Sequence, residues 1–329
     1  MQGIACPIDR RLLDDWQRDF PITPRPFESL ASELGISVDV VLSRLNAMQA
    51  AGRVSRLGAT FAPNAISAST LAAVASPPER LEEVAAIIGA QAGVNHNYQR
   101  EDDWNLWFVA TGRDRADVDA SLKQIQDATG LQVLDLRLMR PFNVDLGFRM
   151  EGPRQLVPPR PVDLNALQDG DRDLLQVLSR GMPITPRPYW DLATNLGRSE
   201  SEVLDRIETL HDAGIISRLG VIVRHRALGW SANAMVVWDL PEHQVEAAGQ
   251  ALAALNGVTL AYERRPVPDV WLYRLYNMVH ARTRSAAQEV IDAATALPEL
   301  AGAKHKVLFS TRCFKQTGAL ISRSEGKAA

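Results

Sequence analysis

The stretch Gly93–Phe108, GVNHNYQREDDWNLWF, has the pattern of a β-hairpin, two strands joined by the polar turn Glu101–Asp103. His96, Tyr98 and Arg100 occupy alternate positions of the first strand, so they point to the same face. An imidazole, a phenol and a guanidinium side by side suit an anionic ligand that must also exchange a proton. An ordinary solvated strand face would show the same alternation, so this stretch alone leaves both interpretations open.

A related hairpin lies in the second half of the chain. Its first strand is Leu260–Pro266, in which Tyr262 and Arg264 match Tyr98 and Arg100. The repetition therefore favours a binding role for both hairpins.

The whole chain of 329 residues is an internal duplication. PITPRPF at 21–27 recurs as PITPRPY at 183–189, and SRLG at 55–58 recurs as SRLG at 217–220. Both pairs are separated by the same 162 positions (21 to 183 and 55 to 217). The proline-rich segment 151–161 is the predicted linker between the copies.

Each copy is expected to contain two domains of an α+β fold. Three helical segments followed by a basic strand are typical of a winged helix-turn-helix. The order strand, helix, strand, strand, helix, strand is that of a ferredoxin-like domain, whose uncovered sheet face needs a partner that the second copy can supply. The predicted ranges are 1–62 for the first winged helix-turn-helix, 63–150 for the first ferredoxin-like domain, 151–161 for the linker, 162–226 for the second winged helix-turn-helix and 227–329 for the second ferredoxin-like domain.

Composition narrows the functional classes. Two cysteines are too few for a disulfide framework or a zinc site. No signal-peptide pattern or long apolar run is present, so we expect a cytoplasmic protein that does not span a membrane. A net charge of −3 is unusual for a dedicated DNA-binding protein. The helix at 200–208 carries four acids against one arginine and would repel phosphate, so we expect no DNA binding.

The domain order resembles the Lrp/AsnC regulator family, and the motifs resemble siroheme decarboxylases, a branch of it. The first subunit type of those enzymes is matched by HNYQR at 96–100, NLWF at 105–108 and RPFNVDLGF at 140–148, and the second type by YERRP at 262–266, MVH at 278–280 and FSTRCFKQTGA at 309–319. The chain thus resembles a fused two-type enzyme over nearly its full length. It departs from the family pattern at Asp102, at Ala281 and in Leu272–Tyr276, which leaves the local proton route open.

This resemblance implies a reaction and its substrate. Siroheme decarboxylases remove carbon dioxide from two acetate side chains of siroheme and leave methyl groups, giving 12,18-didecarboxysiroheme. They use no organic cofactor, and the only metal is the iron that the substrate carries. The resemblance therefore implies no metal site of the protein's own, with siroheme and its product as the partners.

The candidate site residues follow from that chemistry. Histidine titrates near neutrality and suits the proton transfer, so His96 and His280 on the two hairpins are the candidate general acids or axial ligands of the iron. Arginine makes paired hydrogen bonds to carboxylates, of which siroheme has eight. The candidate substrate-binding residues are Tyr98, Arg100, Tyr262, Arg264, Arg265, Arg282, Arg140, Arg312 and Lys315. For Arg56 and Arg218 in the repeated SRLG a role in a turn or in domain packing is favoured, and His225 and His305 are weaker candidates.

Several alternatives remain at this point. Each hairpin could serve one acetate, or one active site could serve both, because Leu260 stands where the first copy has His96. The rival functions are an Lrp/AsnC-type transcriptional regulator and a tetrapyrrole-binding sensor or carrier without catalysis. The two copies form a pseudo-dimer within one chain, which could also form a homo-oligomer or bind additional decarboxylase subunits.

Overall fold

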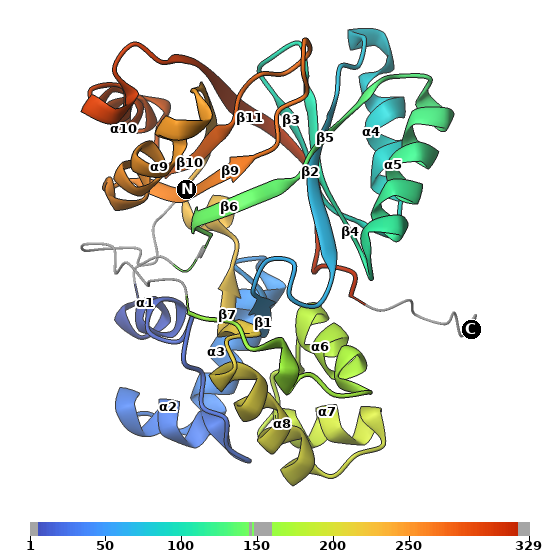
Figure 1. The fold of residues 1–329 in the computed structure, drawn as a ribbon. Helices are drawn as coiled ribbons and strands as arrows, with labels where there is room; N and C mark the ends of the chain where they lie inside the picture. The colour runs from blue at the N-terminus through green and yellow to red at the C-terminus, as the bar shows by residue number, and fades with distance from the viewer. Residues whose placement is uncertain (1–5, 145–146, 148–159, 322–329) are drawn as a thin grey trace.

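The computed structural model describes residues 6–144, 147 and 160–321. The two copies are arranged in two layers: their helix-turn-helix units lie together at one end and their sheets and remaining helices at the other (Figure 1). No helix among these residues is both long enough and apolar enough to cross a membrane.

The helix-turn-helix layer contains the same four elements from each copy. In the first copy they are α1 (Pro7–Asp14), α2 (Pro26–Leu34), α3 (Val38–Ala50) and β1 (Val54–Phe61), and in the second α6 (Asp171–Arg180), α7 (Pro188–Leu196), α8 (Glu200–Asp212) and β7 (Ile216–Val223). The local signals are repeated as well. Ser37 and Ser199 cap α3 and α8 by accepting hydrogen bonds from backbone N–H groups, and Gly35 and Gly197 end α2 and α7 in the left-handed conformation.

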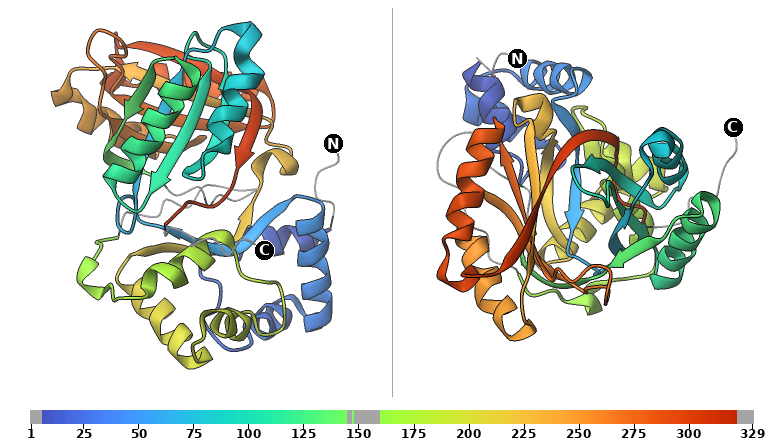
Figure 2. Two further views of the ribbon diagram at one scale, coloured as in Figure 1. Left: turned by 90° about the vertical axis from the view of Figure 1, so that its right-hand side faces the viewer. Right: turned by 90° about the horizontal axis from the view of Figure 1, so that it is seen from above.

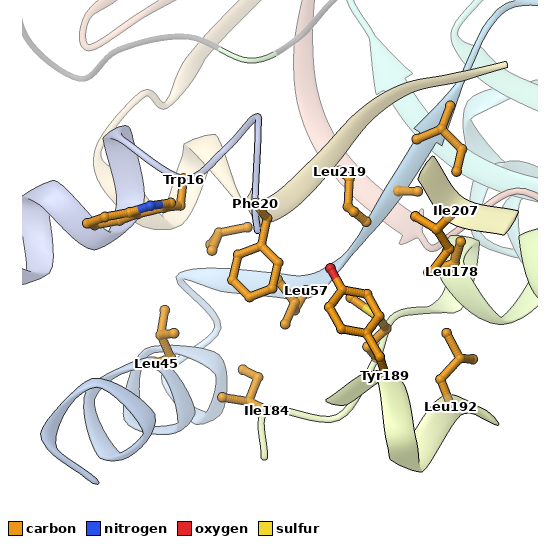
Figure 3. Packing of buried hydrophobic residues seen from close by; sticks show 14 of the residues in the cluster. Trp16, Phe20, Leu45, Leu57, Leu178, Ile184, Tyr189, Leu192, Ile207 and Leu219 are labelled. Carbon is orange, nitrogen blue, oxygen red and sulfur yellow. The ribbon is translucent and has the colours of Figure 1, made fainter. Parts of the chain in front are cut away.

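The two helix-turn-helix units share one hydrophobic core. Figure 3 shows Phe20 and Leu57 of the first copy beside Tyr189 and Leu219 of the second, all of them buried. The Tyr189 hydroxyl donates a hydrogen bond to the carbonyl of Pro21, 2.8 Å away, across the boundary between the copies. The two units are therefore folded against each other as a pair.

Strands β1 and β7 pair antiparallel at the centre of this layer, with Gly58 opposite Gly220. These residues are equivalent in the two copies, so a local twofold axis passes between them. A Cβ atom on Gly58 would lie 2.5 Å from the carbonyl oxygen of Leu178, and one on Gly220 would lie 2.4 Å from that of Trp16. Each glycine thus admits the backbone at the C-terminal end of a copy's first helix or just after it.

The second layer contains two ferredoxin-like domains. The first consists of β2 (Ala68–Val74), α4 (Leu81–Ala90), β3 (Val94–Arg100), β4 (Leu106–Gly112), α5 (Arg115–Thr129), β5 (Val133–Leu136) and β6 (Leu138–Asn143), and the second of β8 (Ala232–Asp239), α9 (Val245–Ala254), β9 (Val258–Arg264), β10 (Leu275–Ala281), α10 (Arg284–Thr295) and β11 (Lys304–Gln316). Short 3₁₀ helices occur at Pro78–Arg80, Leu164–Ala166, Glu242–Gln244 and Pro298–Leu300, and η3 (His225–Leu228) connects β7 to β8. The predicted α+β duplication is confirmed.

The last strand of each copy is shared between the two domains. Their strands form one sheet in the order β5-β2-β4-β3-β11-β8-β10-β9-β6. Strand β11 pairs with β8 over Lys304–Phe309 and then with β3 from Ser310 onward, and Figure 2 shows it (red) running from the second copy to the first. The first copy has a break near Arg137, after which β6 pairs with β9. The order predicted from the sequence has a single last strand in the first copy, whereas the structure divides it into β5 and β6 at this crossover.

Helices cover only the outer faces of the sheet, α4 and α5 on one side and α9 and α10 on the other (Figure 1). The inner faces pack against each other through a cluster that includes Trp107 of the first copy and Met235, Trp271 and Tyr276 of the second. This confirms the expectation that each copy supplies the partner for the other copy's open sheet face.

Candidate active site

A cavity of about 460 Å³ lies between the β1–β7 ribbon and the inner faces of the sheet. Both copies contribute to its walls, through the ribbon and through both hairpins. Its polar and charged lining residues are Ser55, Arg56, Thr60, Ser69, His96, Tyr98, Arg100, Arg218, His225, Arg226, Asn233, Tyr262, Arg264, His280, Gln316 and Thr317. Its apolar lining includes Leu71, Trp107, Val109, Leu138, Met235, Leu260 and Met278. A flat apolar ring system with acidic substituents would find both kinds of surface here.

The cavity is strongly cationic. Five arginines line it, and none of the described lining residues is an aspartate or glutamate. Burial lowers the pKa of Arg56, whose guanidinium makes no hydrogen bond or ion pair with any described residue, and lowers the pKa of Arg100 to about 10. Desolvated positive charge is costly, so a ligand that carries several negative charges would stabilise the arginines of this cavity.

The two Tyr-x-Arg motifs have the same geometry. Arg100 donates a hydrogen bond from Nη1 to the carbonyl of Leu308 (3.0 Å), and Arg264 donates one to the carbonyl of Leu136 (2.7 Å). Each acceptor belongs to the opposite copy and lies close to the point where that copy's last strand crosses between the domains. Each guanidinium also lies over the ring of its neighbouring tyrosine, at 5.8 Å for Tyr98 and 4.6 Å for Tyr262. These contacts fix both arginines at the cavity wall.

His280 lies in a chain of hydrogen bonds that joins the two copies. Its Nε2 is 2.7 Å from the Nδ2 of Asn233, and its Nδ1 is 2.7 Å from the Oγ1 of Thr259. The Oδ1 of Asn233 in turn accepts from Nη1 of Arg100 at 3.2 Å. Burial, followed by the charges of Arg100 and Arg226, lowers the pKa of His280 to about 4. The imidazole is therefore neutral at neutral pH.

His96 has different surroundings. Its ring stacks on that of Tyr98, 6.2 Å away between centroids, and neither ring nitrogen has a hydrogen-bond partner within the described part of the chain. Burial and, to a smaller extent, the charge of Arg56 lower its pKa to about 4. Of the two predicted histidines, His96 is thus the one whose nitrogens are open to a ligand.

The short helix η3 adds two residues that the sequence did not single out as central. The ring of His225 lies 5.3 Å from that of His280, and Arg226 donates hydrogen bonds to the backbone oxygen (2.9 Å) and side-chain oxygen (3.2 Å) of Ser310. His225 had been a weak candidate, and Arg226 carries no sequence signal. Both reach the cavity because β7 leads directly from the ribbon into this helix.

The arginines of the cavity are nearly symmetric, whereas its histidines are not. Arg56 and Arg218 are equivalent in the two copies, as are Arg100 and Arg264. The equivalents of the histidines differ: Leu260 for His96, Thr111 for His280 and Pro63 for His225, as the offsets and strand registers show. All three histidines lie on the wall formed by β3, β8, β10 and η3, and the pseudo-equivalent wall has none.

The structure brings six of the eleven predicted site residues to the cavity: His96, Tyr98, Arg100, Tyr262, Arg264 and His280. It places the other five outside. Arg140 pairs with Glu246 and Glu263, Arg265 lies 3.6 Å from Asp135, Arg282 is exposed over the Trp230 ring, Arg312 pairs with Glu82, and Lys315 donates to the carbonyls of Gly89 and Gln91. Arg56 and Arg218, favoured from sequence as packing residues, line the cavity instead.

The fold and the site define a class before any relative is considered: a fused pair of Lrp/AsnC-type subunits around a cavity for a polycarboxylate. Family models agree with this. The model of the AsnC-like ligand binding domain matches residues 66–143 and 227–315, and that of the siroheme decarboxylase NirDL-like HTH domain matches 9–54 and 171–216.

Relatives over the full length identify the branch. The chain is 54% identical over 316 residues to the siroheme decarboxylase NirDL subunit of Paracoccus denitrificans, covering 96% of this chain and 97% of that protein. Its crystallised relatives include a siroheme decarboxylase NirDL (26% identity, TM-score 0.70, 97% of this chain and 95% of that one) and a NirDL complex with an iron-uroporphyrin III analogue (25%, TM-score 0.68, 95% and 92%). The chain belongs to the siroheme decarboxylase family.

Other relatives are separate subunits that each cover less than half of the chain. The siroheme decarboxylase NirD subunit of Stutzerimonas stutzeri is 47% identical over 146 residues, covering 44% of this chain and 96% of that protein. The NirL subunit of the same organism is 42% identical over 156 residues, covering 47% and 90%. The predicted resemblance to a fused two-type enzyme is confirmed.

Proposed function

We propose that the chain converts siroheme to 12,18-didecarboxysiroheme by removing two acetate carboxyl groups as carbon dioxide. The observation that carries the proposal is the cavity with five arginines, three histidines and no acidic lining residue among those described. The names of its relatives, and the iron-uroporphyrin analogue bound by one of them, support a tetrapyrrole as the ligand.

Each step consumes one proton. The bond between the acetate CH₂ and its carboxylate breaks and releases carbon dioxide, and the electron pair passes into the pyrrole ring. A proton then converts the CH₂ to a methyl group. Protonating the ring before the bond breaks would give the electron pair a place to go, and this ring proton is released once the CH₂ has been protonated. A general acid is therefore useful at both stages. No further cofactor is proposed, since the iron belongs to the substrate.

The arginines are proposed to bind the carboxylates that remain on the substrate. Arg100 and Arg264 are fixed by backbone carbonyls, and Arg56 keeps an unused hydrogen-bonding fork. Such positioning holds one acetate against the histidine wall while the others stay in place. Tyr98 and Tyr262 orient these guanidinium groups through their ring faces. Arg140, Arg265, Arg282, Arg312 and Lys315 are engaged elsewhere, so we assign them no contact with substrate in this arrangement.

His96 is proposed as the proton donor or as the ligand of the substrate's iron, because its ring nitrogens are open to the cavity. A neutral imidazole can bind iron directly. To donate a proton it must first be protonated, and substrate carboxylates provide the negative charge that favours this. His280 is proposed as the second proton-transferring residue, held by Asn233 and Thr259.

One catalytic centre is proposed for both acetates. The idea that each hairpin serves one acetate would require a proton-transferring group on each wall, but the wall with Tyr262 and Arg264 has Leu260 and Thr111 at the histidine positions. The near-symmetric arginines can hold the substrate while the single set of histidines acts on one acetate and then on the other.

Both walls come from one chain, so the chain is proposed to contain a complete site. A homo-oligomer, or a complex with further decarboxylase subunits, would add to this unit, and the cytoplasm remains the predicted compartment.

The regulator alternative is disfavoured by α8, whose Glu202, Asp205 and Glu208 are exposed and would face a nucleic acid.

The proposal is tested by anaerobic incubation of the purified chain with siroheme, followed by mass spectrometry of the tetrapyrrole. Loss of two carbon dioxide molecules per siroheme is expected. Tight binding without any loss would refute catalysis and favour a sensor or carrier. Absence of both binding and loss, together with binding to DNA in a gel shift, would favour the regulator. The Arg312→Met variant, altered at a surface ion pair and at a contact with the Phe314 ring, serves as a control that should retain activity.

A further inference from the structure

We propose that Asn233 is a positioning residue that fixes the tautomer of His280 and links its protonation to the occupancy of Arg100. The inference rests on the proposed function for its catalytic consequence, but its structural content does not. Asn233 lies on β8 directly opposite His280 on β10, and its amide bridges a residue of each copy. No motif in the sequence marks it.

The direction of each hydrogen bond follows from the groups present. A guanidinium only donates, so the atom of Asn233 that faces Arg100 must be Oδ1. The Nδ2 group then faces His280 and donates, so Nε2 of His280 must carry a lone pair. The ring proton consequently lies on Nδ1, from which it is donated to Thr259 Oγ1. The hydroxyl of Thr259 donates onward to the carbonyl of Met278, 3.1 Å away.

This arrangement opposes protonation of His280. A proton on Nε2 would face the NH₂ group of Asn233, and turning the amide by half a rotation would bring that NH₂ group against the guanidinium of Arg100. The other charged or titratable groups near the ring are Arg226 and His225 on η3, and neither offers a negative charge. Within the described lining of the cavity, no carboxylate is available to stabilise an imidazolium.

A carboxylate bound by Arg100 changes this balance. A substrate carboxylate can accept the hydrogen bond that Arg100 Nη1 otherwise donates to Asn233 Oδ1. The side-chain amide of Asn233 is then free to rotate. Its Oδ1 can then accept from a protonated Nε2 and stabilise the imidazolium. Asn233 thereby makes His280 an acid only when Arg100 holds substrate, which keeps the proton transfer tied to binding.

The other copy supplies a natural comparison. Ser69 on β2 occupies the position equivalent to Asn233 and lies opposite Thr111, the equivalent of His280. Serine is too short to bridge two side chains in this way. The variant Asn233→Ser therefore installs a residue that the fold already accommodates at the matching position, and it should fold normally.

The first test is the tautomer of His280 in ¹⁵N-histidine-labelled protein, measured by NMR without substrate. The His280 signal is assigned by its loss in His280→Gln. We expect the Nδ1–H form in the unaltered chain and a shift toward Nε2–H in Asn233→Ser. An Nε2–H tautomer in the unaltered chain, or no change in the variant, would overturn the proposal. This readout needs no turnover, so it stands apart from the fate of the proposed function.

The second test is kinetic. Asn233→Ser should lower kcat about 10- to 100-fold with KM changed less than about threefold, because positioning of the acid is lost while the arginines remain. Asn233→Asp should raise the pH at which kcat falls, since a carboxylate stabilises the imidazolium. Ser231→Ala, an exposed change two residues away whose hydroxyl bonds only a surface carbonyl, should leave kcat within about twofold. An unchanged kcat in Asn233→Ser, or a pH profile of Asn233→Asp that is unchanged or shifted downward, would contradict the proposed link.

Discussion

At the scale of single residues, the site combines buried charge without a counter-charge and neutral histidines. Arg56 illustrates the first property, since its guanidinium is desolvated and has no described hydrogen-bond partner. His96 illustrates the second, with its pKa lowered to about 4. Each property destabilises the folded protein, and a bound polycarboxylate would offset that cost. Substitutions of these residues should therefore change the free energy of unfolding and the affinity for the ligand in opposite directions.

Replacing Arg56 with methionine tests this opposition. We expect the free energy of unfolding to rise by about 1–2 kcal/mol, because a half-buried charge without a counter-charge among the described residues is removed and its volume is kept. Affinity for an iron-uroporphyrin analogue should fall by about tenfold or more, because a clamp is lost. Urea unfolding and ligand titration measure the two effects, with Arg312→Met as the control. Lower stability with unchanged affinity would show that Arg56 is a packing residue.

The lowered pKa of His96 predicts how the free energy of unfolding depends on pH. In the unfolded chain a histidine titrates near 6.5, whereas folded His96 titrates at about 4, so the unfolded state binds the proton first as pH falls. The stability contributed by the neutral ring is complete above about pH 6.5 and is lost as pH falls toward 4, by at most about 3 kcal/mol for this histidine.

The variant His96→Leu, which copies the residue at position 260, should remove this component. Urea unfolding of both proteins at pH 7.5 and pH 4.5 measures it as a smaller loss of stability in the variant. Identical losses in the two proteins would show that His96 does not titrate as an inward-facing neutral group.

Sequence reasoning identified the residues whose direction follows from a local period. His96, Tyr98 and Arg100 share a face because a strand alternates, and all three reach the cavity. Sequence reasoning could not predict where a side chain points when its direction depends on how strands of the two copies pair. Register shifts next to Arg140, Arg312 and Lys315 change the alternation where the strands cross between the copies, and these side chains meet partners outside the cavity. Arg56 and Arg218 face the cavity only because the ribbon lies beneath the sheet.

At the scale of elements, the antiparallel β1–β7 ribbon holds the arginines of the cavity floor in place. One of its close backbone contacts is at Gly58, where an added Cβ would lie 2.5 Å from the carbonyl oxygen of Leu178. The helix periods and caps of the surrounding units were predictable, because Ser37, Ser199 and the glycines act locally. The strand crossovers were not, because the chain changes partner there without a break in its β-pattern.

The change Gly58→Ala should lower the free energy of unfolding by about 2 kcal/mol or more, since a backbone carbonyl cannot move aside as a flexible side chain can. Gly89→Ala is the matched control. Gly89 lies inside α4 and has no atom within 4 Å of an added Cβ, so alanine should leave stability unchanged or raise it by up to about 1 kcal/mol. Chemical unfolding measures both. Equal stability of the two variants would contradict the close packing of the ribbon.

At the scale of the whole molecule, the two copies fold as one unit. Three strand pairings join them, β1 with β7, β3 with β11 and β6 with β9, in addition to the shared cores. The duplication in the sequence predicted this partnership of sheet faces. It did not predict a single cavity, because nothing in either half shows that the histidines of both copies meet on one wall.

Expression of residues 1–150 and 160–329 as separate chains should therefore yield a one-to-one complex. Each half alone would expose unpaired strand edges and an apolar sheet face, so neither is expected to remain a folded monomer. The separate NirD and NirL subunits of Stutzerimonas stutzeri each align with somewhat less than half of this chain. Size-exclusion chromatography with light scattering measures the association. Two stable monomers that do not associate would contradict the account of a shared fold.

The claim that one histidine wall serves both acetates is tested most directly by the products that His96→Leu forms from siroheme. The unaltered chain, assayed alongside by anaerobic mass spectrometry of the tetrapyrrole, should remove two carbon dioxide molecules from each siroheme. If a single centre acts twice, the variant should leave siroheme almost entirely unconverted, with both decarboxylations slowed together. Accumulation of a product that has lost one carbon dioxide, formed at the normal rate, would show that one acetate has a centre of its own and would contradict the account.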